Sequence, residues 1–374
     1  MSASDQFERA RGRSTLNLSV LAIVSGGRSI LQRGQVDRTT LRSAALLGRA
    51  ALLIAVGFFV IVAPAAELAG LTGPLGAPPN AKRVQTLRIT QPGTYENLLV
   101  DGDWIDQDLV RINADNVVLR NCTIRYGRRD GLEIYGRNVV VENCHIHHVI
   151  SGTFKAEKNI DSHGITGRPL HLVVRNTEIS HVTGDALQFD PGRKAEPYAW
   201  DDVRIEHCLL WTGPLDRDYA TYRQGEIPGE NAFDSKVAPD GPRARITITN
   251  TLMRGWGHGA IGNGAALNLK EKIQAVIERC VFVDNDIAFR CRGAGSGRAS
   301  AWVTASDCTV YRTSRVFRLE SKVEHVKIHG LALGEGVEGK FDEAPGAGEG
   351  FELTGERAAP ALAPWPYRSL PVGL

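Results

Sequence analysis

Eight related nine-residue segments recur between residues 116 and 333, at intervals of 22 to 43 residues. Each alternates apolar and polar residues with a period of two, which is typical of a β-strand with one buried face. A repeat of this kind constrains the fold more than any single motif does. The segments are NVVLRNCTI at 116, NVVVENCHI at 138, HLVVRNTEI at 171, DVRIEHCLL at 202, RITITNTLM at 245, QAVIERCVF at 274, WVTASDCTV at 302 and HVKIHGLAL at 325.

A second short strand follows in most repeats. The uneven spacing between repeats excludes helical repeats, but it suits a coil whose turns can lengthen outward while its strands stack. We therefore expect a right-handed parallel β-helix of about eight coils over residues 85–335, with strands about 4.8 Å apart. The second strands are GLEIY at 131, GITGR at 164, ALQFD at 186, AFDSK at 232, ALNLK at 266, AFRCR at 288 and VFRLE at 316.

Stacking turns equivalent residues of successive coils into columns. Five of the six cysteines share the seventh place of the repeat, where Thr177 and Thr251 also stand. Cys122 with Cys144, and Cys280 with Cys308, could pair, but Cys208 has no cysteine beside it. A column of small inward side chains is therefore favoured over disulfides. The place before it predicts an amide ladder formed by Asn121, Asn143, Asn176 and Asn250.

The second strand predicts two outward columns, because its apolar residues take every other position. The middle coils combine acids with Lys236 and Lys270, and Arg290 and Arg292 follow. Opposite charges on adjacent coils can simply stabilise a solvated face. Long polar insertions on the same coils favour a site instead, and they bring Trp200, Trp211, Tyr219 and Tyr222, whose rings could stack on sugars. The columns are Glu133, Thr166, Gln188, Asp234, Asn268, Arg290, Arg318 and Tyr135, Arg168, Asp190, Lys236, Lys270, Arg292, Glu320.

The N-terminus predicts export. Residues 50–66 form an uncharged apolar run of 17, and residues 1–49 contain eight arginines against three acids. This is the pattern of a transmembrane anchor or a signal peptide with a basic cytoplasmic leader. We expect a periplasmic, membrane-anchored or secreted protein, with a linker over 67–84 and an irregular tail over 336–374. The net charge of +2 gives no reason to expect nucleic acid as a partner, and we expect a monomer.

The repeats, together with SHGI at 162, GDALQF at 184 and ENAFDSK at 230, resemble the pectate lyase-like superfamily of right-handed parallel β-helix proteins. The resemblance covers about residues 85–335. It implies a polysaccharide lyase that cleaves an acidic, uronate-containing glycan by β-elimination. In several members, acids on the outer sheet hold Ca²⁺, a lysine abstracts the C5 proton and an arginine assists.

Residue types on the outward face suit that reaction. A hard cation bound by Asp185, Glu230 and Asp234 would neutralise the uronate carboxylate. Lys236, with Lys270 second, is the predicted base, and His163 is the predicted proton donor. Arg290 and Arg292 would bind the carboxylate or the developing enolate. The predicted substrate contacts are Gln188, Asp190, Asn268, Trp211 and Tyr222.

Three other functions stay open. The DSHG segment at 161 is loosely similar to a motif of β-helix C5-epimerases, and GWGHGAIGN at 255 resembles a polygalacturonase segment. The adjacent acid pair of those hydrolases is missing, because GDAL supplies only Asp185. A non-catalytic glycan-binding or scaffold protein could use the same groove.

Overall fold

The computed structural model describes residues 70–151, 161–191, 200–219, 222–238, 241–259, 264–294, 299–342 and 350–362. The predicted leader, the apolar run at 50–66 and the last residues of the tail lie outside these ranges. Within them, no helix has the length and apolarity that crossing a membrane requires.

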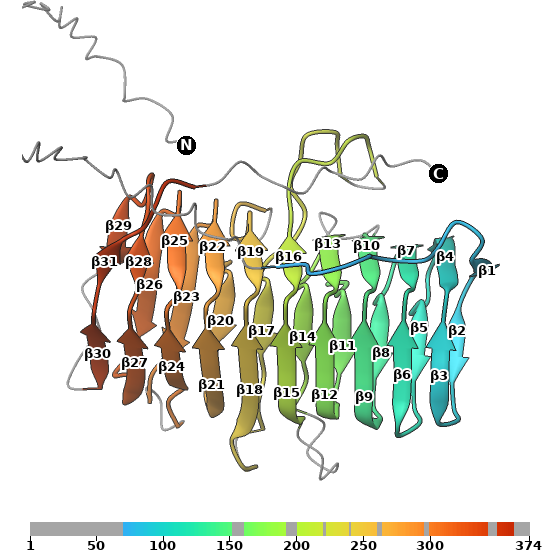
Figure 1. Ribbon diagram of the computed structural model, residues 1–374, viewed down its shortest axis with the longest axis horizontal. Coiled ribbons are helices and arrows are strands. Elements are labelled where there is room, and N and C mark those ends of the chain that lie inside the picture. Colours follow the sequence, from blue (N-terminus) through green and yellow to red (C-terminus); the bar gives the residue numbers. More distant parts are fainter. Residues whose placement is uncertain are drawn as a thin grey trace, which may run out of the picture. The chain divides into compact units, whose positions relative to one another are not determined.

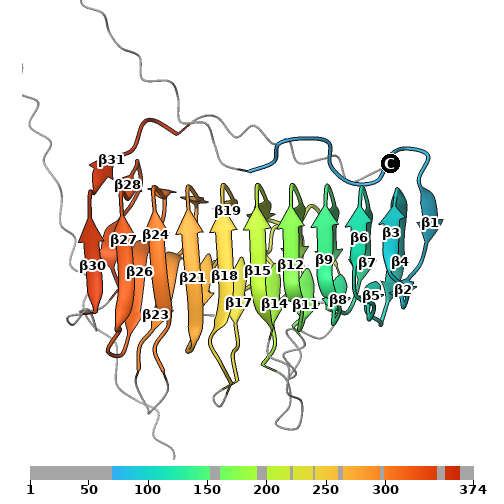
Figure 2. The same ribbon diagram turned by 60° about the horizontal axis from the view of Figure 1, so that its bottom comes forward.

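The described chain forms a parallel β-helix of three sheets, which we name A, B and C (Figures 1 and 2). Each sheet is a row of parallel strands, and successive coils add one strand to each row. Sheet A has 11 strands, and sheets B and C have 10 each, so the stack is longer than the eight coils predicted. The right-handed winding predicted from the sequence is the one that parallel crossovers almost always adopt.

Sheet A contains β1 (Lys82–Val84), β4 (Leu98–Ile105), β7 (Thr123–Gly127), β10 (His145–Val149), β13 (Glu178–Val182), β16 (Leu209–Trp211), β19 (Leu252–Arg254), β22 (Val281–Val283), β25 (Thr309–Tyr311), β28 (Ala332–Leu333) and β31 (Arg357–Ala358).

Sheet B contains β2 (Leu87–Ile89), β5 (Val110–Ile112), β8 (Leu132–Ile134), β11 (Ile165–Gly167), β14 (Leu187–Phe189), β17 (Phe233–Ser235), β20 (Leu267–Leu269), β23 (Ile287–Arg292), β26 (Arg315–Glu320) and β29 (Gly339–Phe341).

Sheet C contains β3 (Gly93–Glu96), β6 (Val117–Arg120), β9 (Arg137–Glu142), β12 (Leu170–Arg175), β15 (Asp201–Glu206), β18 (Ala244–Thr249), β21 (Ile273–Glu278), β24 (Trp302–Ser306), β27 (His325–His329) and β30 (Phe351–Thr354).

The nine-residue repeat is two strands, not one. In the first repeat, β6 ends at Arg120 and β7 begins at Thr123, so the chain passes from sheet C to sheet A at Asn121. Asn121 has a left-handed backbone with φ 52°, and Asn143 and Asn176 at the same place have φ 53° and 42°. Asparagine tolerates this conformation better than most residues do. The prediction of a single strand was therefore wrong at this bend.

The predicted inward columns are confirmed. The second-strand residues from Leu132 to Phe317 are fully buried, and the stacked cysteines are free thiols with at most 1% of their surface exposed. The amide ladder is confirmed from Asn121 to Asn176, and it begins one coil earlier, at Asn97. Asn250 does not join it, because its partners are His207 and Arg279.

The stack also extends beyond the predicted boundaries at 85 and 335. Strand β1 lies in the stretch predicted as linker, and β29, β30 and β31 lie in the stretch predicted as an irregular tail. These end strands pair with the coil beside them, for example Phe317 with Phe341. They cover the apolar end of the stack, where Phe341 and Phe351 pack against Phe317.

Candidate functional site on sheet B

The outward columns predicted from the sequence exist on sheet B. Strand pairing aligns Gln188 with Asp234, Asp234 with Asn268, and Asn268 with Arg290. The next outward position carries Asp190, Lys236, Lys270 and Arg292 on the same coils. Since adjacent strands lie about 4.8 Å apart, these side chains form one continuous polar array, in which the first column is buried and the second is partly exposed.

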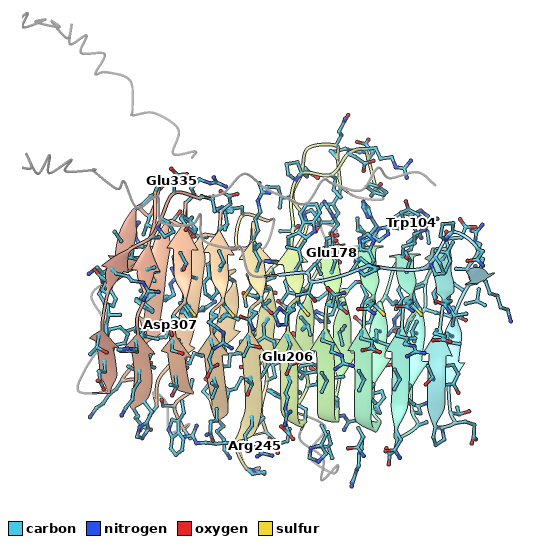
Figure 3. All side chains as sticks on the ribbon, in the orientation of Figure 1. Trp104, Glu178, Glu206, Arg245, Asp307 and Glu335 are labelled. Atoms are coloured by element: carbon cyan, nitrogen blue, oxygen red, sulfur yellow. The ribbon has the colours of Figure 1, made fainter. Side chains whose placement is uncertain are left out.

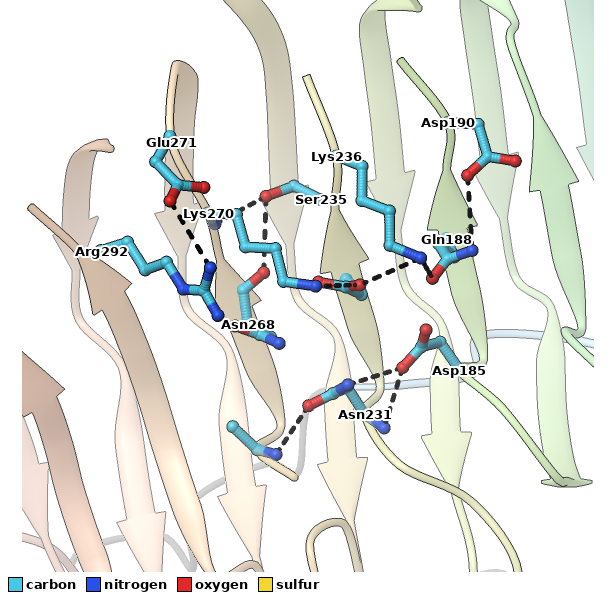
Figure 4. A network of polar contacts seen from close by, with 12 residues as sticks. Asp185, Gln188, Asp190, Asn231, Ser235, Lys236, Asn268, Lys270, Glu271 and Arg292 are labelled. Atoms are coloured by element: carbon cyan, nitrogen blue, oxygen red, sulfur yellow. Dashed lines mark hydrogen bonds and ion pairs between the residues drawn. The ribbon is translucent and has the colours of Figure 1, made fainter. Parts of the chain in front are cut away.

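Its centre is a group of four residues, Gln188, Asp234, Lys236 and Lys270, which we call the lysine–aspartate cluster (Figure 4). Lys270 Nζ lies 2.6 Å from Asp234 Oδ2, and Lys236 Nζ lies 3.9 Å from the same oxygen. The Asp234 side chain is 3% exposed, whereas that of Lys236 is 39% exposed. Burial raises the pKa of Asp234, and the Lys270 ammonium opposes this shift. The cluster thus joins one buried carboxyl group to two amines, of which Lys236 is open to a ligand.

A chain of hydrogen bonds lies behind this cluster. Lys236 Nζ contacts Gln188 Oε1, and Gln188 Nε2 lies 3.0 Å from His163 Nε2. The Asp185 backbone N–H donates to His163 Nδ1 at 3.0 Å. Asp185 Oδ1 in turn accepts from the backbone and side-chain nitrogens of Asn231, at 3.1 and 2.6 Å. The polar residues at the bends before β11, β14 and β17 are therefore hydrogen-bonded from one coil to the next.

His163 and Asp185 do not reach the outer surface. His163 is 6% exposed and Asp185 is fully buried. Burial, followed by the charge of Lys236, lowers the pKa of His163 to about 3. Burial, followed by the charge of Asp234, raises the pKa of Asp185 well above its ordinary value. His163 therefore lies behind Gln188, which separates it from a substrate that contacts Lys236.

The two arginines of β23 are held by one carboxylate. Arg290 Nε donates to Glu320 Oε1 at 2.7 Å, and Arg292 Nε donates to Glu320 Oε2 at 3.0 Å. Arg292 also lies 3.5 Å from Glu271. Arg290 is 9% exposed, so Arg292 is the more accessible guanidinium beside the cluster.

Two further acids interact with the cluster. Burial raises the pKa of Asp161, and Lys236 opposes the shift. Burial, then the charges of Asp234 and Asp161, raise the pKa of Glu230. Glu230 was predicted as a cation ligand, whereas Asp161 was not predicted as a site residue. Asp161 is the first residue of the DSHG segment at 161, but from that segment the sequence analysis predicted a catalytic role only for His163.

A buried tryptophan, Trp200, is hydrogen-bonded to the backbone of Lys236. Trp200 Nε1 donates to the Lys236 backbone carbonyl at 2.9 Å, and its ring lies 5.2 Å from that of Phe189. Trp200 has no exposed surface. The sequence analysis predicted that Trp200 lies in a loop and could stack on a sugar. Its contacts instead hold the end of β17, which carries Lys236.

The other two predicted aromatic contacts lie elsewhere. Trp211 belongs to β16 of sheet A and donates from Nε1 to Glu178 Oε1 at 2.6 Å. Tyr222 is fully buried in a small cluster with Ile150, Leu215 and Tyr219. Neither residue contributes to the outer face of sheet B.

Sheet A carries a separate group of buried imidazoles near Glu178, which Figure 3 labels. The ring of His148 stacks on that of His181 at 4.8 Å, and its Nδ1 lies 2.8 Å from His147 Nδ1. Burial, opposed by the Trp211 hydrogen bond, raises the pKa of Glu178 to about 7. This group lies on sheet A, whereas the lysine–aspartate cluster lies on sheet B, and the sequence patterns did not single it out.

The predicted calcium ligands do not form a ready-made cation site. Asp185 Oδ1 is engaged by Asn231, and Asp234 Oδ2 faces two lysines. Among the residues that the structure describes, no three His, Cys, Asp or Glu side chains are arranged to hold a metal ion. In the same part of the chain, the buried oxygens Asp161 Oδ1, Asp185 Oδ2, Asp234 Oδ1 and Asn268 Oδ1 accept no hydrogen bond, so two of the three predicted calcium ligands keep a spare acceptor. Spare acceptors of this kind suit hydroxyl donors as well as a cation, so no reaction step below is derived through calcium.

Comparison with known proteins gives fold neighbours but no family. No protein-family model matches the chain. No curated protein sequence matches it either.

Among solved structures, the alginate lyase from Paenibacillus sp. str. FPU-7 is 13% identical over 74% of this chain and 89% of its own, with a TM-score of 0.47. Pectate lyase Pel9A is 15% identical over 73% and 69%, with a TM-score of 0.45. The A-module of the Azotobacter vinelandii mannuronan C-5 epimerase AlgE6 is 11% identical over 75% and 91%, with a TM-score of 0.35. The chain is similar to these proteins in its parallel β-helix, a fold that its own strand pairing establishes.

Proposed function

We propose that the protein is a polysaccharide lyase that cleaves a uronate-containing glycan by β-elimination on the outer face of sheet B. The observation that carries the proposal is the lysine–aspartate cluster. It places an accessible amine, Lys236 on β17, beside a buried carboxyl group, and Lys270 on β20 and the two guanidinium groups of β23 follow on the next strands of the same sheet. A base beside groups that bind a carboxylate is the arrangement that β-elimination needs.

The reaction divides among the residues as follows. Arg292, supported by Glu320, binds the uronate carboxylate and stabilises the enolate that forms from it. The Lys236 amine takes the C5 proton. The C5–H electron pair forms the C4–C5 double bond, and the C4–O4 bond breaks with its electrons leaving on O4. The leaving oxygen then needs a proton.

Asp161 and Glu230 are better donors for that proton than His163. Burial raises the pKa of both carboxyl groups, so each holds its proton to a higher pH than an exposed acid does. His163, predicted as the donor from the sequence, is buried behind Gln188. We assign the donor role to one of the two acids.

The test is an assay of the purified full-length chain against alginate, pectate and glycosaminoglycan polymers, with added calcium and with a chelator. A lyase produces a 4,5-unsaturated uronate, which absorbs in the ultraviolet. We expect this absorbance with at least one polymer, and Lys236→Met to lower kcat by at least about 100-fold. Comparing the two arms tests the calcium prediction separately. Lys322→Met, on an exposed residue, is the matched control.

Other outcomes favour the other functions on this fold. New reducing ends without ultraviolet absorbance would indicate hydrolysis. Exchange of the C5 hydrogen with solvent, without chain cleavage, would indicate epimerisation. Retention of the polymer with neither signal would indicate a glycan-binding protein. Each of these would overturn the lyase proposal.

A further inference from the structure

The partly exposed column of sheet B contains a short run of cations with an acid at each end. In coil order, the column reads Asp190, Lys236, Lys270, Arg292 and Glu320. Figure 4 shows the first four of these residues on successive strands. Adjacent strands lie about 4.8 Å apart, so the three cations cover two steps of the stack, about 10 Å. An anion that lies further along the column in either direction therefore meets a carboxyl group.

The cations of this face already have carboxyl partners. Asp234 lies 2.6 Å from Lys270 and 3.9 Å from Lys236. Glu320 accepts hydrogen bonds from both arginines of β23. Within the described residues, the two outward columns from β11 to β26 carry six cations, and seven carboxyl groups interact with them. The cations are Arg168, Lys236, Lys270, Arg290, Arg292 and Arg318, and the carboxyl groups are Asp161, Asp190, Glu230, Asp234, Glu271, Glu320 and Asp342. The face therefore has no excess of positive charge that would attract a polyanion.

Asp190 and Glu320 close the run of cations on opposite sides. Burial raises the pKa of Asp190, and the charges of Lys236 and Arg168 oppose this shift. Strand pairing places Glu320 directly beside Arg292. A second substrate carboxylate over either end of the run would face a like charge at a partly exposed position, which weakens binding by about tenfold. An uncharged sugar at the same place offers hydroxyl groups that can donate to these acids.

We propose that the site takes a glycan in which each uronate lies between uncharged sugars, rather than a homopolymer of uronates. The inference rests on the proposed function, because it places the glycan along the row that contains the base. One uronate that contacts both Lys236 and Arg292 occupies the run of cations. The sugars on either side of it then lie over Asp190 and Glu320, which select against a further carboxylate.

The test compares polymers that share one backbone but differ in charge density. Pectate and alginate are each compared with their own partial methyl ester, in which most uronates are uncharged and the others are isolated. Hyaluronan, which alternates a uronate with an uncharged amino sugar, is the third kind of probe. An ester also makes the C5 proton more acidic, so binding is the primary measurement. Affinity electrophoresis measures it, with a chelator present so that metal ions do not bridge carboxylates.

We expect the natural protein to bind the sparsely charged form of a backbone at least about tenfold more tightly than its fully charged form. Asp190→Asn combined with Glu320→Gln removes both terminal charges with little change of shape, and it should reduce this preference by at least about tenfold. Glu335→Gln combined with Glu352→Gln removes two exposed charges elsewhere and should leave the preference unchanged. Unfolding midpoints check that both double variants are folded. If the first is not, Asp190→Asn alone should still reduce the preference.

Two results would overturn the inference. One is tighter binding of the fully charged polymers by the natural protein, and the other is an unchanged preference after Asp190→Asn and Glu320→Gln. A preference for sparse charge without cleavage would support the inference and remove the lyase function. Cleavage without such a preference would leave the lyase function standing and remove the inference. Absence of binding to every polymer would overturn both.

Discussion

Lys270 Nζ lies 2.6 Å from Asp234 Oδ2 in the lysine–aspartate cluster, closer than Lys236 Nζ, which lies 3.9 Å from the same oxygen. Lys270 and Asp234 are 36 positions apart in the chain and lie on adjacent coils. The carboxyl group is almost fully buried and the amine is 19% exposed, so solvent screens this pair only in part. Their contact ties β17 to β20 at the centre of the proposed site.

Removing the amine is expected to destabilise the protein. In Lys270→Met, Asp234 keeps only the longer contact with Lys236, and we expect a loss of about 2 kcal/mol in unfolding free energy. Urea denaturation measures it. Adding Asp234→Asn should recover part of the loss, because the neutral amide costs less to bury. If the double variant were less stable by the sum of both single losses, the pair would not be coupled.

Glu178 is expected to make stability depend on pH. Its pKa is about 7 in the folded protein against 4.5 as its ordinary value, so the folded state binds the extra proton between these limits. Its stabilising effect is full below pH about 4.5 and is lost as the pH rises through about 7. The difference in unfolding free energy between the natural protein and Glu178→Gln should therefore fall by roughly 1 to 3 kcal/mol across that window.

A histidine on the same sheet gives the opposite sign. Burial lowers the pKa of His145 to about 4 from 6.5, so its neutral form stabilises the fold above pH about 6.5. That contribution is lost as the pH falls toward 4. The difference between the natural protein and His145→Asn should thus rise with pH where the Glu178→Gln difference falls. A flat profile for either variant would contradict the corresponding assignment.

Trp200 is expected to affect catalysis from a buried position. Trp200→Phe keeps an aromatic ring against Phe189 but leaves the Lys236 carbonyl without its 2.9 Å donor. We expect a cost of about 1 to 2 kcal/mol in stability and about a tenfold fall in kcat, because the base is less well placed. Steady-state kinetics on the polymer that the proposed assay identifies would measure the fall in kcat.

Trp211→Phe is the matched control for this prediction. It removes a tryptophan hydrogen bond of similar length, to Glu178, but on sheet A. Stability should fall while kcat and KM stay unchanged. A change in KM for Trp211→Phe would restore the sequence-based hypothesis that this ring contacts sugar.

Asn143 is expected to need both its side chain and its backbone conformation. It donates to Asn121 at 3.2 Å and accepts from Asn176 at 2.7 Å, at φ 53°. Asn143→Gly loses the two side-chain hydrogen bonds, but glycine adopts the left-handed backbone conformation without strain. Asn143→Ala loses the same hydrogen bonds and also strains the backbone at this φ. The unfolding free energy of Asn143→Ala should therefore be about 1 kcal/mol lower than that of Asn143→Gly, as measured by thermal or urea unfolding. Equal stability would mean that the bend carries no backbone strain.

Alternation along the strands predicted correctly which side chains point into the coil and which point away from it, but not that the first outward column is buried. It placed Asp234 beside Asn268 because one residue per coil enters each column, whatever the loop length. The same alternation could not show that Asn121 turns the chain from sheet C to sheet A. A residue with left-handed φ interrupts the strand without disturbing the order of apolar and polar residues.

The bends also explain what was missed in the site. His163 and Asp185 stand just before their strands, where the period of two does not give a side chain's direction. Their inward placement follows from the hydrogen-bond requirements of adjacent coils. Trp200 resembled a surface aromatic because it follows a polar insertion, and its burial depends on contacts with Phe189 and Lys236. Sequence spacing contains no information about such contacts.

Each coil contributes one residue to each column, whatever the length of the loops between its strands. Forty-four positions separate Phe189 from Phe233, yet their strands are immediate neighbours in the sheet. Insertions and deletions in that connection can reshape the surroundings of Lys236 without shifting its row. Duplicating a whole coil, in contrast, would add one member to every column at once. The surroundings of the cluster and the length of its columns can therefore vary through two independent kinds of sequence change.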